Sequence, residues 1–216
     1  MTAHLAVVFA SHNRGKLAEL RGILADLPIE IVPLAVALPG QAQVVEDGAT
    51  LEDNAKKKAL AAAQATTLVT LAEDAGLEVD ALGGRPGVRS ARFARDGATD
   101  AENNAALLGA LLEVDEPHRT ARFRSVFVLV DPWSDGEPRV TEGRCEGRIA
   151  REGRGAGGFG YDPLFVVGDG ERTMAELSDD EKNAVSHRGQ AVRALRPVLE
   201  ELLAQRLAEA RRITAP

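Results

Sequence analysis

The hydrophobic positions of the chain follow the periods of strands and helices in turn. Residues 5–10 (LAVVFA) form a continuous apolar run, which is typical of a strand buried on both faces of a parallel sheet. A short polar loop follows at residues 11–16, and residues 17–27 then carry leucine and isoleucine at helical spacing. These segments predict a strand, a loop and a helix, and the N–H groups at the start of that helix can face an anion.

The next segments predict a strand, a loop and an alanine-rich helix. Residues 30–33 have the pattern of a short strand, and residues 34–49 are loop-like because Pro39-Gly40 is a turn signal. Thr50 is a suitable N-cap for a helix that runs to about residue 66, and acidic residues in its first turn suit the helix dipole.

Two adjacent carboxylates stand out in the stretch that follows. Residues 68–72 are strand-like and lead into Glu73 and Asp74, after which Gly76 is expected to release the backbone into a turn. Ligands of α/β sheets bind beyond the carboxyl ends of strands. Carboxylates at the end of a buried strand need water, a cation or hydrogen bonds. Mg2+ prefers such oxygen ligands, and without a His/Cys cluster the sequence favours magnesium over zinc.

The second half of the chain predicts a helix, two long strands, a short strand and a last helix. Residues 101–114 are amphipathic, residues 120–130 alternate like a half-solvated antiparallel strand, and residues 139–149 return as a second long strand. A short strand at residues 164–167 and a helix at residues 190–212 complete the pattern. The second long strand has one face of small residues: Thr141, Gly143, Cys145 and Gly147.

A glycine-rich run at residues 153–160 contains the aromatic Phe159. A flexible linker is one explanation of such a run, but linkers rarely end in aromatic residues. An aromatic ring between glycines can instead stack on a planar base. Lys182, His187 and Arg188 add donors, which distinguish a keto oxygen from an amino group. For His187 alone, a structural role within the core is the ordinary alternative.

The other polar candidates are weak when taken singly. The loop at residues 11–16 stands where a phosphate-binding loop would, but it lacks the Walker spacing. Exposed cations are the ordinary alternative for Arg14 and Lys16, and exposed acids are the ordinary alternative for Glu46 and Asp47.

Composition narrows the class of protein. The chain has 216 residues and a formal net charge of −7, which argues against a general nucleic-acid binder because such proteins need a basic surface. The single cysteine, Cys145, cannot form an internal disulfide and is expected to be a small buried residue. The N-terminal apolar run lacks the features of a signal peptide, and no apolar segment is long enough to cross a bilayer. We therefore expect a cytoplasmic protein with no membrane partner.

Five segments in order resemble one known family, the Ham1-type nucleoside triphosphate pyrophosphatases. They span nearly the whole chain and read FASHNRGKLAEL, EDGATLEDNAKKKA, LAEDAGLEVDALGGRPGVRSARFA, EGRIAREGRGAGGFGYDPLF and TMAELSDDEKNAVSHRGQA. The resemblance implies one domain over residues 1–216, with an α/β fold of two lobes around a long mixed β-sheet. Helices would flank that sheet, and the active site would lie in a central cleft.

The resemblance also implies the site residues. Asp74 would be a metal ligand and the general base, and Glu46 a second metal-binding acid. The triphosphate loop would be Ser11, His12, Asn13, Arg14, Gly15 and Lys16. The base-binding loop would be Phe159, Gly160, Tyr161 and Asp162, with Lys182, His187 and Arg188 recognising a 6-keto purine. The family commonly has serine where this chain has Ala75, so Ala75 can contact substrate only through its backbone.

The implied activity is Mg2+-dependent hydrolysis of non-canonical purine nucleoside triphosphates such as ITP, dITP and XTP. The products would be the nucleoside monophosphate and pyrophosphate, and the enzyme would be a homodimer. Two alternatives are a Maf-type nucleotide pyrophosphatase and a nucleotide-binding module without catalysis. The first loop disfavours the Maf type, in which it typically reads Ser-Pro-Arg-Arg. Intact Glu46, Asp74 and Lys16 disfavour a non-catalytic module.

Overall fold

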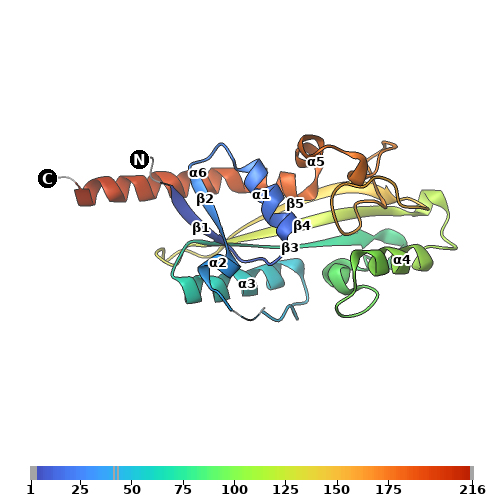
Figure 1. Ribbon diagram of the computed structural model, residues 1–216, viewed down its shortest axis with the longest axis horizontal. Coiled ribbons are helices and arrows are strands. Elements are labelled where there is room, and N and C mark those ends of the chain that lie inside the picture. Colours follow the sequence, from blue (N-terminus) through green and yellow to red (C-terminus); the bar gives the residue numbers. More distant parts are fainter. Residues whose placement is uncertain (1–3, 41, 43, 215–216) are drawn as a thin grey trace.

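The computed structural model describes residues 4–214 except Gln41 and Gln43. Its centre is a six-stranded sheet with the order β2-β1-β3-β4-β5-β6 (Figure 1). The strands are β1 (Leu5–Phe9), β2 (Ile29–Pro33), β3 (Thr70–Val79), β4 (Thr120–Val130), β5 (Arg139–Ile149) and β6 (Phe165–Val167). Strand β1 pairs in parallel with β2 and β3, whereas β3 to β6 pair antiparallel. The predicted α/β fold around a long mixed sheet is confirmed.

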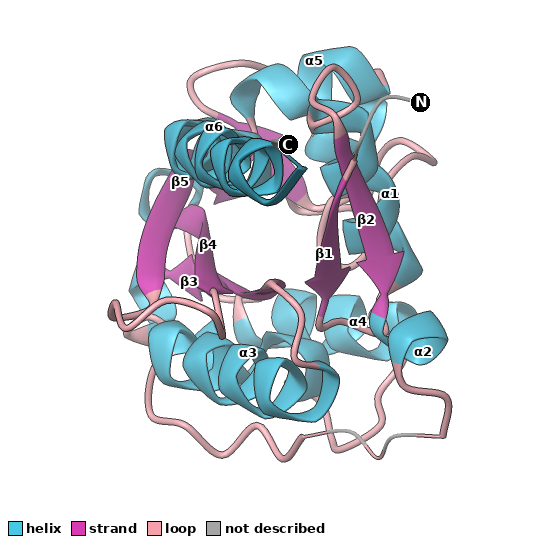
Figure 2. Cartoon of the chain, turned by 90° about the vertical axis from the view of Figure 1, so that its left-hand side faces the viewer, coloured by secondary structure: helices cyan, strands magenta, loops and turns pink. Residues whose placement is uncertain are grey.

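Helices cover both faces of this sheet. They are α1 (Arg14–Ile23), α2 (Leu34–Ala37), α3 (Leu51–Thr66), α4 (Asp100–Ala110), α5 (Asp179–Val185) and α6 (His187–Thr214). Figure 2 shows α6 and α3 on opposite sides of β3, β4 and β5. Leu71 of β3 packs in the cluster that contains α6, and its neighbour Ala72 packs in the cluster that contains α3. Because side chains alternate along a strand, Glu73 lies on the α6 side and Asp74 on the α3 side.

The expectation that strand β3 ends at Glu73 and Asp74 is wrong. The strand continues to Val79, and Gly76 pairs with Arg124 inside it. Gly76 does not make a turn. A Cβ at this position would overlap the carbonyl oxygen of Gly87, so the glycine allows another backbone segment to lie directly against the strand. The two carboxylates therefore lie in the middle of a long strand.

Strand β4 is half-solvated only in its first part. From Ser125 to Leu129 every residue is buried, because Val126 and Val128, which lie on the same face as Arg122 and Arg124, pack against α3. The small face of β5 was expected correctly, and the structure gives its reason. A Cβ at Gly143 would overlap the backbone of His187 and Ala191, so glycine lets α6 begin directly on the strand.

Most predicted helix boundaries agree with the structure to within a few residues. Helix α3 starts as expected after Thr50, whose hydroxyl accepts a hydrogen bond from the Asp53 amide at 3.1 Å. Helix α6 starts at His187, earlier than expected, because the Ser186 hydroxyl accepts a hydrogen bond from the Gly189 amide at 3.1 Å.

The structure also tests the expected loop at residues 34–49 and the expected burial of Cys145. Part of the segment expected to be a loop is the short helix α2, and Gln41 and Gln43 of that segment lie outside the described residues. Cys145 is buried and free, as expected. Within the described residues, no helix combines the length and apolar character that a bilayer span requires.

Candidate active site

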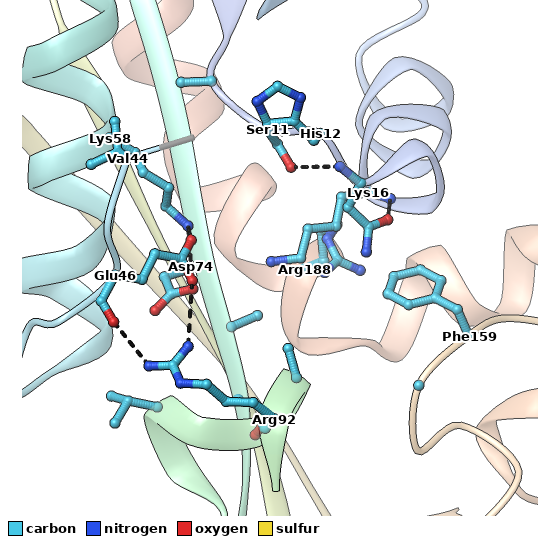
Figure 3. Close-up of a pocket in the computed structure, with 18 of the residues that line it drawn as sticks. Ser11, His12, Lys16, Val44, Glu46, Lys58, Asp74, Arg92, Phe159 and Arg188 are labelled. Carbon is cyan, nitrogen blue, oxygen red and sulfur yellow. Dashed lines mark hydrogen bonds and ion pairs between the residues drawn. The ribbon is translucent and has the colours of Figure 1, made fainter. Parts of the chain in front are cut away.

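A cleft of about 610 Å³ lies between the β1–α1 loop, α3, the middle of β3, the glycine-rich loop and the start of α6. Figure 3 shows Lys58, Glu46, Asp74 and Arg92 along one wall, and Lys16, Arg188 and Phe159 across from them. The predicted residues that line it are Ser11, His12, Asn13, Lys16, Glu46, Asp74, Ala75, Phe159, Gly160, Tyr161, Asp162, His187 and Arg188. The structure does not place Arg14, Gly15 and Lys182 among the lining residues of this cleft. The sequence-predicted residues thus come together, while their individual roles stay predictions.

The predicted phosphate loop is ordered by its own side chains. The Asn13 side chain caps α1 by accepting a hydrogen bond from the Lys16 amide at 3.0 Å, and the Asn13 amide donates to the Ser11 hydroxyl at 3.2 Å. The Lys16 ammonium is 3.9 Å from Glu73 Oε2, and burial lowers the pKa of Lys16. A cation beside a helix N-terminus, paired only at this distance, is suited to a phosphate.

Asp74 is buried, with 7% of its surface exposed, but its partners are few. Lys58 Nζ is 3.3 Å from Asp74 Oδ1, and the Asn54 amide donates to Asp74 Oδ2 at 3.2 Å. Burial raises the pKa of Asp74, although Lys58 and Lys16 act in the opposite direction. A carboxylate held in this way is suited to accept a proton or a cation, as a catalytic base requires.

Glu46 lies beside Asp74 because two cations hold it there. Lys58 Nζ donates to Glu46 Oε1 at 2.7 Å and also to the Glu73 carbonyl oxygen at 2.8 Å. Arg92 donates to the Glu46 carbonyl oxygen at 2.9 Å. Both acids thus contact the same ammonium group, which places their carboxylates at one point of the cleft.

Sequence reasoning missed Lys58, Asn54 and Arg92. A signal was available for the first two. Within α3 the buried positions include Leu51, Asn54, Ala55 and Ala59, so a polar Asn54 lies on the apolar stripe, and Lys58 follows it by one turn. A polar residue on a buried helix face needs a partner. Arg92 carried no such signal, since its contact with Glu46 spans 46 positions.

The donor set of Glu46 and Asp74 fits a magnesium ion. The described residues contain no group of three or more His, Cys, Asp or Glu side chains that could hold a metal by themselves. Mg2+ does not need such a group, because it usually takes one or two carboxylates and completes its shell with water and substrate phosphates. The two carboxylates offer that kind of site, because Lys58 bonds only one oxygen of each, Glu46 Oε1 and Asp74 Oδ1, and does not bond Glu46 Oε2 or Asp74 Oδ2.

Glu73 has a very different environment on the other face of β3. It is fully buried, and Arg188 Nε donates to both of its carboxylate oxygens at 3.0 Å. The Ser125 hydroxyl donates to Glu73 Oε1 at 2.7 Å. Burial alone would raise the pKa of Glu73, but Arg188, Lys16 and Ser125 together lower it to about 2. Glu73 is therefore held as an ionised partner of Arg188.

The cations expected to recognise a base are engaged in buried ion pairs. Arg188 also contacts Glu19, and Lys182 Nζ lies 2.6 Å from Asp162 Oδ2 and 2.7 Å from Glu19 Oε1. The Phe159 ring covers both cations, with its centroid 4.9 Å from Lys182 Nζ and 5.4 Å from Arg188 Cζ. Glu19 is another residue that the sequence analysis missed, and it orients both cations from α1.

His187 is the predicted base contact with unused hydrogen-bonding capacity. Its ring stacks on Phe123 at a centroid distance of 4.7 Å and an interplanar angle of 16°. Burial lowers the pKa of His187 well below its usual value, so the imidazole is neutral. Its Nδ1 atom is buried and has no hydrogen-bond partner among the described residues. A buried polar atom without a partner is unusual in a folded protein, and His187 is among the residues that line the cleft.

Comparisons with known proteins show the family to which the chain belongs. A sequence profile of the Ham1 family matches residues 7–198. The chain belongs to the Ham1 family. One relative, the dITP/XTP pyrophosphatase of Desulforamulus reducens, is 48% identical over 198 residues, which cover 92% of this chain and 97% of the relative.

Solved structures of Ham1 proteins have the same fold. A HAM1 protein from Coxiella burnetii is 46% identical, with a TM-score of 0.82 over 91% of this chain and 99% of that one. A dITP/XTP pyrophosphatase from Mycobacterium abscessus is 47% identical, with a TM-score of 0.71 over 88% of this chain and 98% of that one. The family match over residues 7–198 includes every residue of the candidate site.

Proposed function

We propose that this Ham1 family member is a nucleoside triphosphate pyrophosphatase that removes non-canonical purine nucleotides such as ITP, dITP and XTP. The relatives named dITP/XTP pyrophosphatases support the reaction class. One observation carries the proposal for this chain. The paired acids Glu46 and Asp74 face the same cleft as the phosphate-loop cation Lys16 and the aromatic Phe159, so one substrate can contact all of them.

In the proposed reaction, water attacks a phosphorus of the phosphoanhydride that joins the nucleoside monophosphate to the pyrophosphate group, and that bond breaks. Asp74 orients the water and accepts its proton. Lys16 and Lys58 place positive charge beside the phosphate oxygens, where negative charge develops. Glu46 and Asp74 would hold Mg2+, which when bound supplies further positive charge at those oxygens. The products are the nucleoside monophosphate and pyrophosphate.

Selection for the base rests on the opposite end of the cleft. Phe159 offers a ring for stacking, which is worth about 1–3 kcal/mol per base. His187 offers a neutral imidazole, and the positive charges of Lys182 and Arg188 lie close enough to lower its pKa, although each cation is paired with a carboxylate. A 6-keto oxygen accepts hydrogen bonds and is favoured by such charge. An amino group in its place would leave donors facing donors.

We also propose that the protein acts on the cytoplasmic nucleotide pool as one domain and forms a homodimer. The long β4–β5 hairpin is the proposed interface, because its turn exposes 70% of Trp133 and the strand beyond it exposes 39% of Val140. Light scattering coupled to size-exclusion chromatography measures this state directly. A monomer at working concentration would contradict the dimer without touching the proposed reaction.

The activity is tested by pyrophosphate release from a panel of triphosphates, measured with and without Mg2+. We expect ITP, dITP and XTP to be hydrolysed with a kcat/KM about a hundredfold or more above that for ATP, in which a 6-amino group replaces the keto oxygen. Chelation of the metal should abolish turnover. A preference for pyrimidine or other nucleotides would favour a Maf-type specificity. Tight binding without pyrophosphate release would favour a non-catalytic nucleotide-binding module.

A further inference from the structure

Helix α4 contacts the predicted base-binding loop (residues 159–162, called the base loop below) through two side chains that lie one helical turn apart. Asp100 Oδ2 accepts a hydrogen bond from the Gly160 amide at 2.7 Å. The Asn104 amide donates to the Gly160 carbonyl oxygen at 3.0 Å. The N–H and the C=O of the residue that follows Phe159 are therefore both bonded to α4, although the two segments are 56 to 60 positions apart in the chain.

The base loop needs such contacts because the glycines in it allow its backbone many conformations. Gly158 and Gly160, on either side of Phe159, have φ angles of +71° and +63°. Glycine adopts such angles readily and adopts many others as readily, so these residues do not fix the direction of the Phe159 side chain. The Phe159 amide donates to Asp162 at 2.9 Å, which fixes the peptide on its N-terminal side. Asp100 and Asn104 bind the N–H and the C=O of Gly160, and so fix the backbone on the C-terminal side of Phe159.

Helix α4 is a firm support for this purpose. A capping box joins Thr99 and Glu102 at its start, with the Thr99 amide 2.7 Å from a Glu102 carboxylate oxygen. Leu107 of the same helix is fully buried. Asn103 accepts a hydrogen bond from the Ala94 amide at 3.0 Å, which ties α4 to the segment that carries Arg92. Side chains on such a helix have little freedom to follow the loop.

Asn104 has a further property that stability does not explain. Its Oδ1 atom is buried and has no partner among the described residues. An unpaired buried oxygen costs free energy, so a leucine of similar size would remove that cost together with the hydrogen bond to Gly160. The amide is therefore better suited to placing Gly160 than to stabilising the fold.

We infer that Asp100 and Asn104 are positioning residues that hold the Gly160 peptide and thereby set the Phe159 ring at the base end of the cleft. Asp100 also lines the cleft, but in this role both residues act through Phe159 and not on the reacting atoms. This inference deepens the proposed function and rests on it for its kinetic consequence. Tyr161 anchors the loop separately, because its hydroxyl donates to the Ser90 carbonyl oxygen at 2.9 Å. Loss of the α4 contacts should therefore loosen the loop locally and leave the fold intact.

The first experiment needs no substrate and stays valid if the proposed function fails. Trp133 is the only tryptophan and lies exposed in the β4–β5 turn, so Trp133→Phe with Phe159→Trp places one fluorophore on the loop. Adding Asp100→Ala or Asn104→Leu should shift its emission to longer wavelength and increase quenching by acrylamide. Adding Asp96→Ala, an exposed acid just before the same helix, should change neither. Unchanged fluorescence in both α4 variants would overturn the inference.

The second experiment tests the effect on turnover. With native Phe159, Asp100→Ala and Asn104→Leu should each raise KM for ITP about three- to tenfold with kcat nearly unchanged. Asp100→Asn keeps an acceptor for the Gly160 amide and should restore most of the loss. In a Phe159→Leu background the α4 substitutions should have no further effect, since the ring they position is gone.

The outcomes separate the possible roles. Additive effects in the Phe159→Leu background would mean that Asp100 or Asn104 contacts the substrate directly, and would overturn the positioning role. A midpoint of thermal unfolding lowered by more than about 4 °C in Asn104→Leu would make that residue structural. If Asp100→Ala does not fold, Asn104→Leu and Asp100→Asn still decide the question. Absence of ITP turnover in the unmodified protein would defeat the proposed function alone, because the fluorescence comparison stands without it.

Discussion

Glu73 and Asp74 are neighbours in β3, yet the two faces of the strand give them different chemistry. Both are buried. Glu73 receives hydrogen bonds from Arg188 and Ser125, and its pKa falls to about 2. Asp74 shares Lys58 with Glu46, receives one amide hydrogen bond, and has a raised pKa. Partners, and not burial, decide which carboxylate is a fixed charge and which can bind a proton or a metal.

The difference extends to the residues around each carboxylate. On the Glu73 face, Glu19 and Arg188 form a closed set of buried ion pairs that organises the base end of the cleft. On the Asp74 face, Lys58 joins two acids that still face the open cleft. The Glu73 face therefore supplies paired charges that hold the cleft in shape. The Asp74 face supplies carboxylates that can still bind substrate, a proton or a metal ion.

The largest expected effect is the loss of stability when the ion pair between Glu73 and Arg188 is broken. Glu73→Gln leaves the buried Arg188 without its charge partner, and should lower the free energy of unfolding by about 3–5 kcal/mol. Urea denaturation measures this. Glu78→Gln on the same strand breaks a partly exposed pair with Arg124, 2.8 Å away, and should cost only about 0–1 kcal/mol. Equal costs for the two variants would contradict the distinction between the faces.

The pH dependence of the free energy of unfolding should also show that Glu73 stabilises the fold in its ionised form. The folded pKa of Glu73 is about 2, below its ordinary value of 4.5, so the ionised group stabilises the fold at any pH above the ordinary value. That contribution is lost as the pH falls from the ordinary pKa of 4.5 to the folded pKa of about 2. The stability gap between the unmodified protein and Glu73→Gln, measured without metal, should therefore be constant from pH 7 to about 5 and shrink below that. A gap that widens on acidification would show that Glu73 is not held ionised.

On the Asp74 face, removal of Lys58 should affect catalysis strongly. Lys58→Met takes away the cation between Glu46 and Asp74, and should lower kcat/KM for ITP about 10²–10³-fold. Lys57→Met is the matched control, because this neighbouring lysine of α3 pairs with Asp47 at the exposed surface and is 47% exposed. Steady-state pyrophosphate release compares them. Similar activities for the two variants would remove Lys58 from the reaction.

A smaller effect is expected at the base end. His187→Ala removes the unpaired imidazole nitrogen and should reduce the ratio of kcat/KM for ITP to that for ATP about tenfold. The ratio matters more than either value, because a general loss of packing would lower both together. An unchanged ratio would exclude His187 from base recognition and shift that role to Phe159 and the buried cations.

Sequence patterns predicted the fold well for a physical reason. Long strands and helices have local periods, so β4, β5 and α3 were predicted with their observed boundaries. The end of β3 was not, because Gly76 was interpreted as a turn, whereas it serves the close approach of Gly87. That role depends on a segment folding back against the strand, which no local pattern reports.

The partners of the acids were the least predictable part of the site. Contacts from Lys58 to Asp74, from Arg92 to Glu46 and from Arg188 to Glu73 span 16, 46 and 115 positions. Only the assembled sheet brings them together. The alternation of side chains along β3 could have separated the two carboxylates, but only once the strand was known to continue past both of them.

Asp74→Asn is the most direct test of the central claim, that the carboxylate on the α3 face performs the chemistry. The substitution removes the proton acceptor and a metal ligand, and relieves the cost of a buried charge with a raised pKa. We predict that pyrophosphate release from ITP in the presence of Mg2+ falls at least about 10²–10⁴-fold, while the midpoint of thermal unfolding is unchanged or higher. Near-normal ITP hydrolysis by a folded Asp74→Asn variant would contradict the account.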